Sequence, residues 1–199
     1  MTDTGEFDWE DYPNISSAYR KGSPTLWGIQ QIRKKGLRDM GASLSSDQAH
    51  RLALGAETLT LRVMQASATA LALARFLHGH AAVRAVHYPG LAGHPQHDIA
   101  LRLFRSGSWL LSFELNNPDD IIPILNRLRI AGRATGMGDA RTLVIPVAPT
   151  IYWEVGPEIR ARMNIADELV RVSVGLEDTD ELIADFSEAL RLPRLPSSN

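Results

Sequence analysis

The hydrophobic pattern of the sequence changes its period near His80, and this change decides the kind of fold. Residues 57–79 are rich in Ala and space their apolar side chains as one long helix does. After His80 the apolar residues tend to alternate with polar ones, which is typical of strands. Four strands are expected, over Val83–Tyr88, Trp109–Leu115, Arg141–Ile145 and Leu169–Val174.

Turn and capping residues separate these strands and predict helices between them. The helices are expected from His94-Pro95 to about Phe104, from Asn117-Pro118 to Arg129 with Gly132 as the stop, from Gly156-Pro157, and from Asp178 to about Leu190. This alternation predicts an α/β or α+β domain over residues 80–192, with a sheet of about four strands and helices on one face. Residues 57–79 link it to what precedes, and residues 193–199 form a tail.

Residues 1–56 are expected to be connecting structure. Residues 1–22 mix acidic, aromatic and turn-forming side chains without a period, which indicates an arm that packs on another surface. Ser23-Pro24 begins a helix that Gly41 closes. A capping box over Ser45–Gln48 begins a second short helix, which ends near Gly55.

Composition narrows the function classes. With 21 basic and 23 acidic side chains the formal charge is −2, so no excess of positive charge suggests a nucleic acid or an anionic membrane as partner. The absence of Cys excludes disulfides, thiolate metal ligands and a cysteine nucleophile in this sequence. The longest apolar-rich run, 66–77, is too short to span a bilayer. We expect a soluble cytoplasmic protein.

Arg171 is the first candidate for chemistry. A period of two places Val170, Val172 and Val174 on one face of the last strand and Arg171 on the other. A guanidinium beside Ser173 and Gly175 has room for a carboxylate or phosphate, which its planar fork can hold by two hydrogen bonds. The alternative from spacing alone is a solvated arginine on the exposed side of a sheet.

Other candidate motifs are weaker. Gly136-Met137-Gly138-Asp139 allows the backbone to approach a ligand closely, or it is a plain turn. His94 and His97 lack a third metal ligand, so we predict a surface pair and no metal site. Lysine occurs only at Lys21, Lys34 and Lys35, and none is predicted to be catalytic.

Several motifs together resemble the pyridoxal-phosphate (PLP) enzymes of cysteine and methionine metabolism, and among them O-acetylhomoserine sulfhydrylase. The most specific run is Leu169–Asp178, and the others are Thr4–Trp9, Gly36–Ser45, Gly55–Arg62, Val86–Leu91 and Gly138–Val144. The resemblance covers nearly the whole chain in order. The departures lie at Gln65-Ala66, Gly136, Pro146–Ala148 and Thr150–Tyr152, where hydrogen-bond donors expected near the substrate are replaced.

The resemblance implies the C-terminal part of a fold-type I PLP enzyme, with the PLP-binding lysine outside this chain. Residues 1–56 would then be the end of the cofactor domain and its connecting helices. Arg171 would bind the substrate's α-carboxylate, and Gly138, Asp139 and Arg141 would lie in a substrate-side loop. PLP would act as the electron sink while a thiol or sulfide replaces the acetate of an activated homoserine.

Three roles stay open at the level of sequence. The chain is the substrate-binding portion of a transferase in methionine biosynthesis, completed by a PLP-binding N-terminal half or by a homologous full-length subunit. Alternatively it is a non-catalytic subunit that docks on such a partner, or the product of a truncated or mis-started reading frame.

Overall fold

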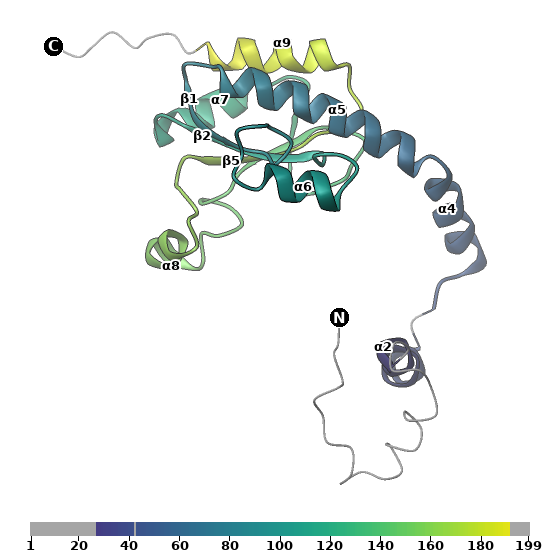
Figure 1. Ribbon diagram of the computed structural model, residues 1–199. Coiled ribbons are helices and arrows are strands. Elements are labelled where there is room, and N and C mark those ends of the chain that lie inside the picture. The colour runs from purple at the N-terminus through teal and green to yellow at the C-terminus, as the bar shows by residue number, and fades with distance from the viewer. Residues whose placement is uncertain (1–26, 42, 192–199) are drawn as a thin grey trace, which may run out of the picture. The chain divides into compact units, whose positions relative to one another are not determined.

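The computed structural model describes residues 27–41 and 43–191 of the chain. These residues form two compact units that divide between Ala56 and Glu57. The first unit holds helices, and the second holds a sheet with the remaining helices (Figure 1). The predicted arm over 1–22, the Ser23-Pro24 helix start and the tail over 193–199 lie outside the described residues.

The first unit contains helix α2 (Trp27–Gln31), the π-helical segment η2 (Ile32–Leu37), α3 (Arg38–Met40) and most of α4 (Ser46–Glu57). Gly41 ends α3 with a left-handed backbone at a φ of 66°, a conformation that costs glycine little. The capping box at α4 is confirmed, because Ser45 N donates to Gln48 Oε1 at 3.1 Å and Gln48 N donates to Ser45 Oγ at 3.3 Å. The helix continues through Gly55, beyond its expected end.

The second unit is built on a mixed sheet of five strands. They are, in spatial order, β1 (Val83–His87), β2 (Leu110–Leu115), β5 (Leu169–Ser173), β4 (Leu143–Pro146) and β3 (Gly132–Arg133). The β3–β4 pair is parallel and the other pairs are antiparallel. All four predicted strands are confirmed. The fifth strand, β3, was not predicted, because two residues are too few to show alternation. Gly132 was expected to stop the helix that starts at Asn117-Pro118, but that helix ends at Arg127 and Gly132 begins β3.

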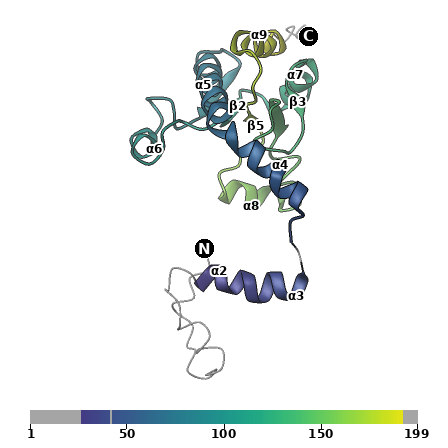
Figure 2. The ribbon, with the colours of Figure 1, turned by 90° about the vertical axis from the view of Figure 1, so that its right-hand side faces the viewer.

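Five further helices and one 3-10 turn complete the second unit. Their bounds are α5 (Leu59–His78), α6 (His97–Leu103), η3 (Pro118–Asp120), α7 (Ile121–Arg127), α8 (Gly156–Arg162) and α9 (Thr179–Leu190). The predicted cap of α9 is confirmed, because Asp178 Oδ1 accepts hydrogen bonds from Asp180 N and Glu181 N. Helices α5, α7 and α9 cover one face of the sheet, as expected, whereas the short α6 and α8 lie on its other side (Figures 1 and 2).

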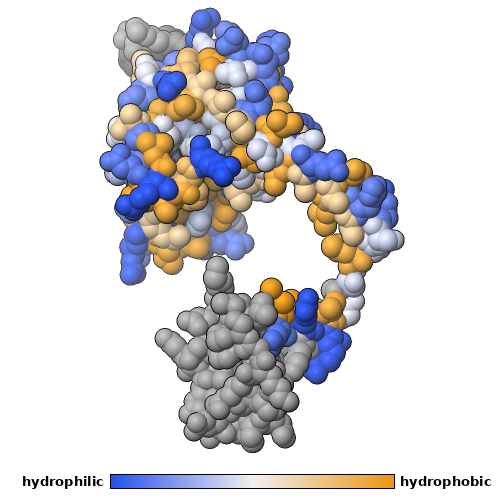
Figure 3. Space-filling view, turned by 45° about the vertical axis from the view of Figure 1, so that its right-hand side comes forward, coloured by the Kyte–Doolittle hydropathy of each residue, from blue (hydrophilic) through white to orange (hydrophobic). Residues whose placement is uncertain are grey.

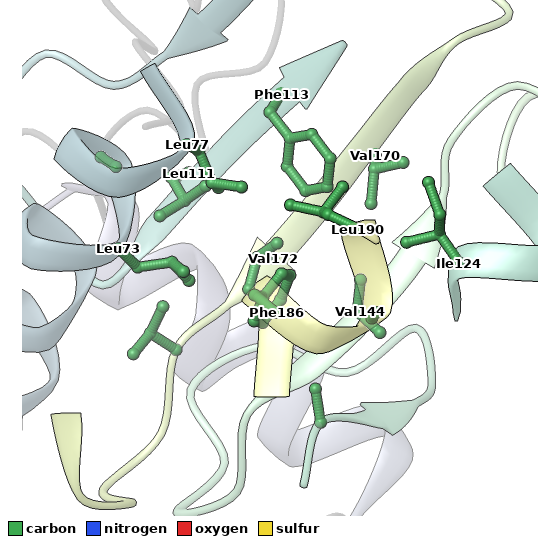
Figure 4. Packing of buried hydrophobic residues seen from close by; sticks show 14 of the residues in the cluster. Leu73, Leu77, Leu111, Phe113, Ile124, Val144, Val170, Val172, Phe186 and Leu190 are labelled. Carbon is green, nitrogen blue, oxygen red and sulfur yellow. The ribbon is translucent and has the colours of Figure 1, made fainter. Parts of the chain in front are cut away.

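The core lies between the sheet and helices α5, α7 and α9. Val170, Val172 and Val174 are at most 1% exposed, so the predicted valine face is confirmed. Phe113 of β2 meets Phe186 of α9 edge to face at 6.4 Å between ring centroids (Figure 4). By contrast, the first turns of α5 expose Leu59, Leu61 and Met64, and apolar surface is visible along this part of the molecule (Figure 3).

Charged side chains join β1 to β2 on the face opposite the core. Glu114, whose side chain is 14% exposed, accepts hydrogen bonds from Arg84 Nη2 at 2.7 Å and lies 2.9 Å from His87 Nε2. Burial alone would raise the pKa of Glu114, but the hydrogen bonds with His87 and Arg84 outweigh burial and hold that pKa below its usual range. The carboxylate thus ties the edge strand to its neighbour in ionised form.

Tyr88 follows β1 and is completely buried. Its hydroxyl donates to the Ser108 carbonyl at 2.7 Å, and a Cβ on Gly107 would lie 2.7 Å from the hydroxyl oxygen. Glycine at this position therefore leaves room for the phenol. Burial raises the pKa of Tyr88 to about 12, because the ionised phenolate would lose its hydration.

The raised pKa of Tyr88 predicts how stability responds to alkali. Between pH 10 and pH 12 the unfolded chain loses the phenolic proton while the folded chain keeps it, so the free energy of unfolding falls as the pH rises. Tyr88→Phe should reduce this slope, although the lost hydrogen bond costs about 1 kcal/mol at every pH. Urea unfolding followed by circular dichroism between pH 9 and pH 11.5 measures both effects. An unchanged slope in Tyr88→Phe would contradict the prediction.

Candidate functional site

Arg171 stands in the middle of β5, on the face of the sheet that lies opposite the core. In the register of the sheet it is directly opposite Ser112 of β2 and Ile145 of β4. The next residue in the same row is His87 of β1, which pairs with Ser112. Because directly opposed residues of antiparallel strands point to the same side, this row places Arg171 between polar and apolar neighbours.

The guanidinium of Arg171 contacts the backbone of the loop between β3 and β4. Its Nη2 donates to the Thr135 carbonyl at 2.6 Å and lies 3.4 Å from the Gly136 carbonyl. Its Nε is buried and has no hydrogen-bond partner among the described residues. A fully solvated arginine, the alternative from spacing, would not have this arrangement. The loop carbonyls hold Nη2 of the guanidinium. Its other N–H groups can still donate to an acceptor with more negative charge than a carbonyl, such as a carboxylate.

The loop that holds Arg171 is itself attached to β5. Gly138 has a φ of +75°, which side chains rarely adopt, and its N–H donates to Ser173 Oγ at 3.0 Å. Ser173 is two residues from Arg171 and therefore points to the same face. The predicted ligand loop Gly136–Asp139 is thus fixed to the same strand at two points.

A second set of contacts fixes the far end of this loop. Thr142 N and Thr142 Oγ1 donate to the two carboxylate oxygens of Glu177 at 2.6 and 2.7 Å, and the Gly175 N–H donates to Thr142 Oγ1 at 2.9 Å. The Leu176 N–H donates to the Ala140 carbonyl at 2.8 Å. Glu177 lies within the most specific motif, Leu169–Asp178, but the sequence predicts no role for it; in the structure it holds the loop.

Asp139 and Arg141 pair mainly with each other. The Arg141 N–H donates to Asp139 Oδ1 at 3.0 Å, and Arg141 Nε lies 3.7 Å from the same oxygen. The Arg141 side chain is 79% exposed. Of the four candidate residues, Gly138 and Asp139 are joined to Arg171 through the loop, whereas Arg141 extends into solvent.

A small cavity lies beside Gly138 and Asp139. Its volume is about 80 Å³, and its lining comes from α5, the start of β2, the loop and the end of β5: Leu59, Arg62, Val63, Ala66, Trp109, Gly138, Asp139, Ala140, Val174 and Leu176. Neither Arg62 nor Trp109 was predicted from the sequence to be part of a site. Arg62 ends the motif Gly55–Arg62, but no local pattern relates Trp109 to a loop some thirty residues away.

A larger hollow lies away from this site. It measures about 640 Å³ and is lined by residues of α7, α9 and the segment between α7 and β3, among them Arg129 and Asp185. The Asp185 carboxylate accepts hydrogen bonds from the backbone N–H groups of Arg129 and Ile130 at 3.0 and 2.9 Å. The Asp185 carboxylate is therefore already bonded to the backbone of the segment between α7 and β3, so Arg171 remains the better candidate for binding a ligand.

The histidine pair makes local contacts. His97 Nδ1 lies 2.8 Å from the Pro89 carbonyl, and His94 Nδ1 accepts a hydrogen bond from the Gln96 N–H. Among residues 27–41 and 43–191, no three His, Asp or Glu side chains come together in a way that could hold a metal ion. Nor does this part of the chain contain a helix long and apolar enough to cross a membrane.

The chain matches a family model described as Cys/Met metabolism PLP-dependent enzyme over residues 17–191. It is 41% identical over 162 residues to an O-succinylhomoserine sulfhydrylase of Mycobacterium tuberculosis, a match that covers 79% of this chain and 40% of that protein. It is 34% identical to O-acetyl-L-homoserine sulfhydrylase 1 of Thermus thermophilus, which covers 96% of this chain and 48% of that protein. The chain therefore spans less than half the length of these relatives.

Solved structures agree with this relationship. A protein described as an O-acetylhomoserine (thiol)-lyase from Campylobacter jejuni, which holds a pyridoxyl-lysine phosphate group, matches with a TM-score of 0.78 at 32% identity. That match covers 84% of this chain and 40% of the other. An O-acetylhomoserine sulfhydrylase of Wolinella succinogenes matches with a TM-score of 0.73 at 29% identity, over 94% of this chain and 50% of the other.

The contact at Gly175 predicts the effect of one added methyl group. A Cβ there would lie 2.5 Å from the carbonyl carbon of Arg141 and 2.6 Å from Thr142 N, so the loop or the strand must move. Gly175→Ala should lower the free energy of unfolding by about 1–3 kcal/mol. Denaturant unfolding measures this loss. Gly93→Ala is the matched control, because nothing lies within 4 Å of its Cβ position, and equal effects of the two variants would contradict the packing argument.

Proposed function

This chain belongs to the Cys/Met metabolism PLP-dependent enzymes, and on that basis we propose that it is the substrate-carboxylate-binding portion of an O-acetylhomoserine sulfhydrylase-like transferase. The reaction joins the four-carbon unit of an activated homoserine to a thiol or sulfide, as a step of methionine or cysteine biosynthesis. We place it in the cytoplasm, because a chain without Cys suits a reducing compartment.

The observation that carries this proposal is the state of the Arg171 side chain. Its guanidinium is oriented by the Thr135 carbonyl, and its Nε lacks a partner among the described residues. A carboxylate is the natural acceptor for such a fork, because charge-assisted hydrogen bonds are shorter and stronger than bonds to neutral carbonyls. The α-carboxylate of an amino acid would therefore bind Arg171 in competition with the loop carbonyls.

The described residues offer a site for this carboxylate, whereas PLP needs a further group. PLP bonds covalently through its aldehyde to a lysine amine in such enzymes. The resemblance assigns that role to none of Lys21, Lys34 and Lys35. As the resemblance implies, the amine would come from a PLP-binding N-terminal half or from a homologous full-length subunit.

The contribution of this chain is then orientation. Arg171 would hold the two carboxylate oxygens at once and so fix the rotation of the amino acid about the bond between its Cα and its carboxylate. Ser173, Gly138 and Thr142 keep the loop in register with β5, so the carbonyl that orients Arg171 stays in place. Asp139, together with Gly138, would form the side of the site nearest the small cavity.

Removal of the guanidinium tests the role of Arg171. In the enzyme assembled from this chain and its PLP-bearing partner, Arg171→Ala should raise KM for the amino acid about 30-fold, which corresponds to a loss of about 2 kcal/mol from charge-assisted hydrogen bonds. The absorbance spectrum of bound PLP should stay the same. Arg171→Lys should restore only part of the affinity, because an ammonium lacks the planar fork.

Arg160→Ala is the matched control. Arg160 of α8 also has a buried Nε without a partner in the described part of the chain, but its Nη2 pairs with Asp167, which lies between α8 and β5. Its loss should leave KM within about twofold. An unchanged KM in Arg171→Ala would refute the carboxylate role. An assembled pair that binds PLP and the amino acid without turnover would identify a non-catalytic subunit instead. Retention of PLP by this chain alone after desalting would refute the need for a partner's lysine.

A further inference from the structure

Helix α6 exposes its apolar side chains although it belongs to the folded second unit. Ile99, Leu101 and Leu103 are 47%, 67% and 63% exposed, and Phe104, which caps the helix, is 65% exposed. No residue of the helix is buried. An amphipathic helix of a globular protein ordinarily packs its apolar side chains against the core. Here the helix stands out from the sheet (Figure 2), so these side chains are free to contact another polypeptide.

The helix is held in this position by its N-terminal end. His97 Nδ1 lies 2.8 Å from the Pro89 carbonyl. The backbone between β1 and α6 forms successive turns, in which the Leu91 N–H donates to the Tyr88 carbonyl and the His94 N–H donates to the Leu91 carbonyl, both at 3.0 Å. Because Tyr88 is buried in the core, these turns fix α6 to the folded unit and present its remaining surface to the outside.

Two apolar pairs lie on the exposed surface of α6. Ile99 and Leu103 are four residues apart and share one side of the helix. Leu101 and Phe104 are three apart and share another side. Side chains of this size each carry roughly 150–200 Å², so with their exposed fractions the four offer about 400 Å² of apolar surface. A standard interface buries about 800 Å² per partner, somewhat more than half of it non-polar, so these four side chains supply most of the apolar area that a stable dimer needs.

Two charges of opposite sign lie between the apolar pairs. Asp98 and Arg102 are four residues apart, about 6 Å along the helix axis, and neither side chain has an ion pair or hydrogen bond with another described residue. A second copy of α6 that runs in the opposite direction about a two-fold axis brings its Arg102 opposite Asp98 and its Asp98 opposite Arg102. A parallel copy would bring like charges together. The order of the two charges therefore favours an antiparallel copy of the same helix.

We propose that α6 is a self-association surface, through which two copies of this chain form a two-fold symmetric dimer with their α6 helices antiparallel. Asp98 of each copy pairs with Arg102 of the other. The middle of this charged pair lies one residue, about 1.5 Å, from the middle of the pair Ile99 and Leu103, so one two-fold axis serves both. The inference does not depend on the carboxylate site, and its failure would leave the role of Arg171 untouched.

Sedimentation equilibrium of the full chain between about 1 and about 300 µM measures the dimer, and the wild type should change from monomer to dimer mass over this range. Asp98→Arg and Arg102→Asp each bring like charges together at both contacts, so each should weaken the dimer about tenfold or more. The double reversal should restore it to within about threefold of the wild type. Because the double reversal leaves each charge at the less favourable end of the helix dipole, this rescue cannot come from a more stable helix.

Leu103→Gln tests the apolar part of the surface. It should weaken the dimer about tenfold, because it removes apolar area from both sides of the contact. Ile122→Gln is the matched control, since Ile122 is 54% exposed on α7, on the other side of the sheet, and it should leave the dimer within about twofold of the wild type. Circular dichroism of each variant checks that the fold is kept.

Disulfide formation keeps the test decisive if a charge reversal disturbs α6. The chain has no Cys, so Asp98→Cys and Arg102→Cys each carry a single thiol. When the two variants are mixed and oxidised, they should cross-link to each other in preference to themselves, and mass spectrometry distinguishes the products. A monomer at every concentration, or a dimer that the α6 variants leave unchanged, would overturn the proposal. A double reversal without rescue, or disulfides mainly between identical variants, would refute the antiparallel pairing.

Discussion

The close approach of Gly175 to the backbone of Ala140–Thr142 is the contact on which the arrangement of the site depends. It allows the end of β5 to run directly beside the loop, with no side chain between them. Thr142 and Glu177 then form hydrogen bonds across the junction, and the Leu176 N–H reaches the Ala140 carbonyl. Because the loop cannot slide along the strand, the carbonyls that orient Arg171 are held opposite it. Gly175 thus allows β5, whose valines pack in the core, to hold the loop that orients Arg171 on the opposite face of the sheet.

The sequence predicted the elements whose side chains repeat regularly. Alternation identified the valine face of β5, and capping residues such as Ser45 and Asp178 located the starts of α4 and α9. The two-residue strand β3 was missed, because Gly132-Arg133 is too short to carry a period. Helix α7 ended earlier than expected for a related reason: Leu128 turns to an extended backbone without a glycine or proline to announce it.

The site could be predicted only in part, because its parts are joined by long-range contacts. The period of β5 was sufficient to separate Arg171 from the core, but neither interpretation of its environment included the Thr135 carbonyl, which is 36 residues away in sequence. Trp109 and Arg62 meet Gly138 only through folding of three separate segments. The expected role of Arg171 came from the family resemblance and not from its spacing. The relatives confirm the family, although they are more than twice as long as the segment that matches this chain. Exposed apolar side chains on α6 and α8, such as Leu101 and Ile159, are typical of surfaces that another polypeptide covers.

Both edges of the sheet are poor templates for another strand. At one edge, β1 is interrupted by an irregularity between Val83 and Ala85 and carries the charged Arg84 there. At the other edge, β3 offers only two residues. Bulges, charges and short outer strands are the means by which natural sheets avoid uncontrolled edge-to-edge growth and amyloid-like stacking. The edges of the described sheet therefore disfavour a continuous intermolecular sheet and leave helices and loops as the better contact surfaces of this domain.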